Sequence, residues 1–120
     1  MYDIPKWEIN GLEFEYDFDD ADAMDQYGEA FRQLRERMES YPLEGLKADQ
    51  IRFESNSMFI LFDDLFGPGT AEKLFHGKAN LRIIYQVYDS FLAFVEKNVN
   101  RGDEERLKHY QNFKKRKKKR

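Results

Sequence analysis

The residues whose types and spacing most nearly match a phosphate or metal site lie in one short stretch, residues 63–80. Gly77 and Lys78 look like the end of a phosphate-binding loop. That loop requires a glycine five positions before Gly77 and a serine or threonine after the lysine. This chain has Glu72 and Ala79 at those two positions. The mismatch argues against a nucleotide-binding site.

Two adjacent acids, Asp63 and Asp64, are the next candidates for metal binding or acid–base catalysis. Neighbouring side chains on a helix point about 100° apart, so these carboxylates are poorly placed to share one metal ion or one proton. We expect both to be solvated near a helix end. The histidines are His76 and His109, and His76 suits a helix C-terminus, which favours a cation. We expect no catalysis, no metal and no cofactor.

Charge is divided unevenly along the chain, whose net charge is −3. Residues 1–113 carry 13 basic and 23 acidic side chains, a net charge of −10, and residues 114–120 (KKRKKKR) add seven positive charges. Such a tail can bind phosphate backbones through counterion release, or it can be a solvated end without a partner. Nucleic-acid binding usually comes with a basic folded surface. Because this body is acidic, we favour a solvated, disordered tail.

Length and composition indicate one small domain. The 120 residues suit a single domain, and the absence of cysteine excludes both a disulfide framework and a thiolate metal site. No apolar run approaches the roughly 20 residues of a membrane span, and the acidic start is unlike a signal peptide. We expect a cytoplasmic protein without a membrane partner.

The N-terminal residues 6–18 predict a β-hairpin. Apolar and polar residues alternate on both sides of Asn10-Gly11, a dipeptide typical of the type I′ turn that joins two strands. A two-residue turn places Trp7 opposite Phe14 on the apolar face. Because a lone two-stranded hairpin is marginal in water, we expect this face to pack on helices.

Helical periodicity predicts a mainly α fold of four to five helices packed with the small hairpin. The expected helices cover about residues 24–41, 48–66, 71–76, 80–99 and a stretch from 103 onward. Pro42 and Pro68 cannot continue a helix, and glycines such as Gly67 and Gly77 can close one. Residues 1–100 would form the domain, and residues 101–120 a C-terminal helix and the tail.

Two polar residues are expected to begin helices in the central part of the chain. Thr70 and Asn80 each precede a helical pattern, and either side chain can accept a hydrogen bond from a backbone N–H as an N-cap. Residues 100–102 (Asn-Arg-Gly) are expected to break the long helix.

The run FDDLFGPGTAEKLFHGKANLRIIYQVYDSFLAFV resembles a family of small tail assembly chaperones from siphophages and prophages of Gram-positive bacteria. The resemblance covers most of residues 7–100, while Pro68 and His76 differ from the expected pattern. The shared features are an Asp-x-x-Phe-Gly helix end, a Gly-Thr-Ala-x-Lys-x-Phe-x-Gly-Lys run, Asn-Leu, and an aromatic-rich helix. The motif residues are Phe66, Gly67, Gly69, Thr70, Gly77, Lys78 and Asn80.

The resemblance implies a role without catalysis. Such chaperones hold the long tape measure protein soluble in the host cytoplasm while tail tube subunits polymerise around it, and they are absent from the mature virion. The family commonly makes a longer second product by ribosomal frameshifting, for which a run such as Lys117 to Lys119 can supply the codons. Expected partners are the tape measure protein, the tail tube protein and this longer form of the chain.

Apolar helices in excess of what 120 residues easily cover favour a partner groove or a homo-oligomer. We expect the groove beside Phe59, Phe62, Phe66, Tyr85 and Tyr88, although for any single one of them a place in the core is the simpler interpretation. The alternatives to a chaperone are a small phage nucleic-acid-binding or regulatory protein that uses the basic tail, and a structural virion component.

Overall fold

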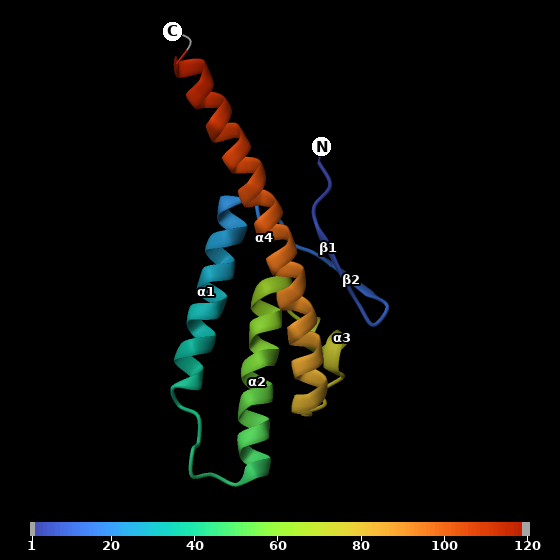
Figure 1. Ribbon diagram of the computed structural model, residues 1–120. Helices are drawn as coiled ribbons and strands as arrows, with labels where there is room; N and C mark the ends of the chain where they lie inside the picture. Colours follow the sequence, from blue (N-terminus) through green and yellow to red (C-terminus); the bar gives the residue numbers. More distant parts are fainter. Residues whose placement is uncertain (1, 119–120) are drawn as a thin grey trace.

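The protein is a β-hairpin followed by four helices, which confirms the predicted mainly α fold with a small N-terminal hairpin. A computed structural model describes residues 2–118, and the side chains of residues 2–116. The elements are β1 (Lys6–Ile9), β2 (Leu12–Glu15), α1 (Ala21–Met38), α2 (Lys47–Phe66), α3 (Thr70–Phe75) and α4 (Leu81–Lys118). Helix α2 lies between α1 and the first part of α4, and the hairpin and α3 lie on the α4 side (Figure 1).

The hairpin has the predicted turn and register. Asn10 and Gly11 have φ values of 50° and 78°, as a type I′ turn requires, and Trp7 pairs with Phe14. Trp7 is buried, and its indole Nε1 donates a hydrogen bond to Ser90 Oγ of α4 at 3.0 Å. The apolar face of the hairpin therefore packs on the helices, as expected.

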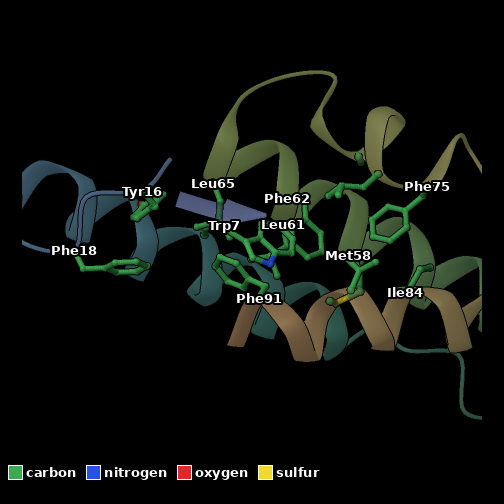
Figure 2. Close-up of a cluster of buried hydrophobic side chains, with 14 residues drawn as sticks. Trp7, Tyr16, Phe18, Met58, Leu61, Phe62, Leu65, Phe75, Ile84 and Phe91 are labelled. Carbon is green, nitrogen blue, oxygen red and sulfur yellow. The ribbon is translucent and has the colours of Figure 1, made fainter. Parts of the chain in front are cut away.

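An aromatic cluster around Trp7 forms the centre of the core (Figure 2). The Trp7 ring lies 5.8 Å from Phe62 and 5.8 Å from Phe66 of α2, and 5.3 Å from Phe91 of α4, between ring centroids. Phe75 of α3 packs on Phe62 at 5.7 Å. Offset and edge-to-face contacts at these separations each add roughly 0.5–1.5 kcal/mol beyond the burial of area.

The loop between α2 and α3 uses positive φ, where glycine has no steric penalty. Gly67 and Gly69 have φ values of 108° and 89°. The prediction that Thr70 caps α3 is wrong: Gly69 is the N-cap residue, and the Thr70 hydroxyl instead donates to the Gly67 carbonyl at 2.7 Å. This hydroxyl turns back to the preceding loop because Thr70 is already inside the first turn of the helix.

Two more capping interactions surround α3. The Asn80 side chain accepts hydrogen bonds from the backbone N–H groups of Arg82 and Ile83 at 3.0 and 3.3 Å, which confirms the predicted N-cap of α4. We expected Asp63 to be solvated, and this expectation is wrong. Its carboxylate accepts the backbone N–H of Ala71 at 2.8 Å, because the tight loop returns the start of α3 to the end of α2.

Helix α4 does not break at residues 100–102, so the predicted separate C-terminal helix is wrong. Gly102 is buried inside the continuous helix, where α4 passes the turn before α1, and Arg106 forms an ion pair with Asp19 at 3.3 Å. A glycine costs a helix only about 1 kcal/mol, which these contacts can offset. Residues 114–118 continue the helix instead of forming a disordered tail, and residues 119–120 lie outside the described part of the chain.

Truncating the core at Phe91 should destabilise the fold strongly. We expect Phe91→Ala to lower the free energy of unfolding by about 3–5 kcal/mol, because it leaves a cavity beside Trp7. Urea unfolding followed by the fluorescence of Trp7 measures this change. Phe113→Ala, which removes the same ring from an exposed position, should change stability by less than about 0.5 kcal/mol. A loss below about 1 kcal/mol for Phe91→Ala would contradict this account of the core.

Two helical glycines should respond differently to alanine. Gly28→Ala in α1 has open space around its added Cβ and should stabilise the protein by about 1 kcal/mol. In Gly102→Ala, the Cβ would lie 2.9 Å from Asp19 Oδ1. The Asp19 side chain must then move and loosen its ion pair with Arg106, so we expect part of that gain to be lost. Thermal unfolding of both variants, repeated in an Asp19→Ala background, tests this account. Gly102→Ala should recover its gain only in that background.

Candidate partner-binding surface

The three predicted partner residues on α2 lie in or against the core. Phe62 is fully buried. Phe59 is half-buried and stacks on Phe75 at 5.2 Å, and Phe66 is half-buried against Trp7. The hairpin and α3 therefore cover the side of α2 on which a groove was expected, and Phe62 has no surface there to offer a partner.

The two predicted tyrosines on α4 remain nearer the surface. Tyr85 is 44% exposed, and its hydroxyl donates to the Glu54 carboxylate of α2. This hydrogen bond, together with burial, raises the pKa of Tyr85 to about 12. Tyr88 is half-buried, and burial raises its pKa too. Of the five predicted residues, Tyr85 alone is exposed.

The motif residues between α2 and α4 have structural roles. Gly67, Gly69 and Gly77 all have positive φ, and His76 ends α3 in the left-handed conformation with φ 52°. Asn80 caps α4. Lys78 is exposed. In residues 2–118 no cluster of three or more potential metal ligands occurs. Among the same residues, no helix is both long enough and apolar enough to cross a membrane.

Three large apolar side chains are exposed at three-residue intervals near the end of α4. We call residues 103–118 the C-terminal arm; every side chain described in it, from 103 to 116, is exposed. Leu107, Tyr110 and Phe113 are 55%, 58% and 67% exposed, respectively. Their three-residue spacing was the available signal. What the sequence could not show is that these side chains stay exposed among the described residues.

The arm projects beyond the helical body (Figure 1). Near its start, Arg106 forms an ion pair with Asp19 in the turn before α1. An isolated helix of this length is marginal in water. The arm is therefore a helix whose apolar side chains have no partner within the described residues. Its end is strongly basic, and Lys114 Nζ lies 5.6 Å from the centre of the Tyr110 ring.

The raised tyrosine pKa values predict a loss of stability in alkali. Tyr16 and Tyr85 both have a pKa of about 12 in the folded protein, against an ordinary 10.0. A pKa raised by folding stabilises the fold fully below pH 10, and this contribution disappears as pH rises toward 12. Urea unfolding at a series of pH values should show the free energy of unfolding falling between pH 10 and 12. Tyr85→Phe should make this fall less steep.

The substitution Glu54→Gln distinguishes the causes of the two raised pKa values. It should lower the pKa of Tyr85 toward 10.0 by removing the anionic hydrogen-bond acceptor. The pKa of Tyr16 should stay unchanged, because burial and the nearby Tyr27 raise it. Ultraviolet absorbance of tyrosinate follows both titrations. An unchanged pKa of Tyr85 would contradict the assignment of its shift to Glu54.

Comparison with known proteins gives one match. No curated protein and no solved structure matches the chain significantly. A model of a family of unknown function (DUF6673) matches residues 10–120, which include β2, all four helices and the arm. The chain therefore belongs to the DUF6673 family of unknown function.

Proposed function

We propose that this protein is a tail assembly chaperone of a siphophage or prophage, without catalytic activity. It would bind the tape measure protein in the host cytoplasm and keep it soluble while the tail tube assembles. The observation that carries this proposal is the C-terminal arm, an amphipathic helix that exposes Leu107, Tyr110 and Phe113 to a partner. The resemblance of residues 63–95 to such chaperones supports it.

The physical requirements of this role suit the arm. A long helical client has apolar stripes that aggregate when they are exposed, and an amphipathic helix can cover them at i, i+3 and i+4 positions. Three large side chains along one edge of the arm supply such anchors. The residues before 114 carry a net charge of −10, and this charge opposes self-association of the chaperone.

The wider set of partners follows from the same proposal. The tail tube protein would displace the chaperone during assembly, so the chaperone would be absent from the mature virion. A frameshifted longer form would extend the chain beyond the arm and could add a second contact to the client. A slippery heptamer and an overlapping downstream reading frame in the gene are required for that form.

Co-expression with the tape measure protein of the same genome tests the proposal. We expect the tape measure protein to be insoluble alone, soluble with this chain, and retained with it in a pull-down. A triple substitution of Leu107, Tyr110 and Phe113 by serine should abolish both effects, because it removes the apolar anchors but leaves the core intact. Circular dichroism should show that the triple variant still folds.

The matched control uses exposed leucines in the loop between α1 and α2. Leu43→Ser with Leu46→Ser also removes exposed apolar side chains, but we expect it to leave the solubilised fraction unchanged. If the arm and loop variants behave alike, the arm is not the client site. If neither the short nor the longer product solubilises the client, the chaperone proposal is wrong.

A second candidate function rests on the basic end of the arm. Residues 114–118 are helical and all basic, so they could bind nucleic-acid phosphates. Binding that weakens steeply with salt and disappears when these lysines and arginine are replaced by glutamine would favour a nucleic-acid-binding or regulatory protein. Detection of the protein in purified virions would instead favour a structural component.

A further inference from the structure

Helices α1 and α2 enclose a crevice with two adjoining hollows. One hollow has a volume of about 210 Å³ and is lined by Gln26, Glu29, Ala30, Gln33 and Asp64. The other has a volume of about 270 Å³ and is lined by Arg37, Ser40, Phe53, Asn56, Ser57 and Ile60. On α1, Gln33 of the first hollow and Arg37 of the second are four positions apart. On α2, Asp64 and Ile60 have the same spacing, so the hollows follow one another along the helix pair.

Arg37 brings a positive charge to one end of the crevice, and its guanidinium is only partly hydrogen-bonded. Its Nη2 donates to the Ser57 carbonyl at 2.8 Å. Its Nε is buried and has no hydrogen-bond partner among the described residues. No carboxylate among the described residues forms an ion pair with Arg37 either. A buried donor left without an acceptor costs about 1–3 kcal/mol, and more when it is charged.

Asp64 brings the opposite charge to the other end. Its backbone carbonyl accepts from Gln26 Nε2 at 2.6 Å, but its carboxylate Oδ2 is buried and has no hydrogen-bond partner in the described part of the chain. The neighbouring Glu29 is already engaged by Arg32 and Gln33. The crevice is therefore lined by a cation, Arg37, and an anion, Asp64, and each has one buried polar atom that no described residue satisfies.

The separation of these groups suggests the shape of a ligand. Ser57, which Arg37 contacts, and Asp64 are seven residues apart on α2, which corresponds to about 10 Å along the helix axis. Two side chains seven residues apart on another helix lie on one face at the same spacing. Between the charged ends lie the buried Ala30 and the exposed Ile60, which give a third helix an apolar contact. Side-chain ridges of one helix pack into such a furrow between others.

We propose that the α1–α2 crevice binds a helix of a partner protein that presents an acidic side chain to Arg37 and a basic side chain to Asp64. This charge pattern defines the register of the bound helix, since a shift by one turn leaves both groups unpaired. The site is separate from the C-terminal arm and does not depend on the proposed function. Failure of the tape measure experiment leaves it standing, and its own failure leaves the arm unaffected.

Model helical peptides added to the full-length protein test the proposal. The probe is an alanine-rich helix with glutamate and lysine seven positions apart and one leucine between them. Matched peptides carry glutamine at both positions, lysine at both, or glutamate at both. Fluorescence anisotropy at low salt should show the glutamate–lysine peptide binding about tenfold more tightly than the glutamine peptide, which corresponds to about 1.4 kcal/mol.

Charge reversal in the protein should change this preference. Arg37→Glu makes both ends of the crevice negative, so the preferred peptide should become the one with two lysines. Asp64→Lys should instead favour the peptide with two glutamates. Arg35→Glu and Glu44→Lys change the net charge equally at exposed positions outside the crevice and should leave the order of affinities unchanged.

Two results would overturn the proposal. One is equal affinity of the glutamate–lysine and glutamine peptides for the unmodified protein, including no detectable binding of either. The other is an unchanged preference in both charge-reversal variants, each shown to fold by circular dichroism. A nuclear magnetic resonance titration gives an independent readout: the Arg37 Nε–H signal should shift with the glutamate–lysine peptide and stay in place with the glutamine peptide.

Discussion

The fold depends on the burial of one tryptophan between elements that are far apart in the chain. Trp7 on β1 packs against Phe62 and Phe66 of α2 and Phe91 of α4, and its N–H donates to Ser90. A two-stranded hairpin is marginal alone, so this contact stabilises the hairpin, and the hairpin in turn closes the core between α2 and α4. The indole N–H has a partner inside the protein, so its burial leaves no unsatisfied donor.

That arrangement determines which apolar surface remains for partners. With the hairpin and α3 against α2, Phe62 is fully buried and Phe59 and Phe66 pack on neighbouring rings. The apolar side chains of the arm, far from this cluster, are more than half exposed. The molecule thus consists of a packed body, whose central aromatic cluster is buried, and a projecting helix, which exposes three large apolar side chains. A division of this kind suits a protein that recognises another helix.

Polar side chains also fall into two groups, those with hydrogen-bond partners in the protein and those with a buried atom that has none among the described residues. Asp63 and Asn80 use their side chains to satisfy backbone N–H groups at the starts of α3 and α4, which makes the loop around α3 well defined. Arg37 and Asp64, in contrast, have buried atoms without partners. Ser55 Oγ in the core is a third such atom among the described residues. Only Arg37 and Asp64 are charged and line the α1–α2 crevice, which is why the proposed partner helix is placed there.

The sequence alone determined the local structure: the Asn10-Gly11 turn and the pairing of Trp7 with Phe14, the range of α2, and the Asn80 cap. These features depend on the φ preferences, side-chain hydrogen bonds and periodicity of residues close together in the chain. Only the tertiary structure decided that the hairpin and α3 cover the groove expected beside Phe62, that α4 continues through Gly102, and that Arg37 and Asp64 share a crevice. Burial and charge pairing depend on which distant segments come into contact, and a local sequence pattern does not show those contacts.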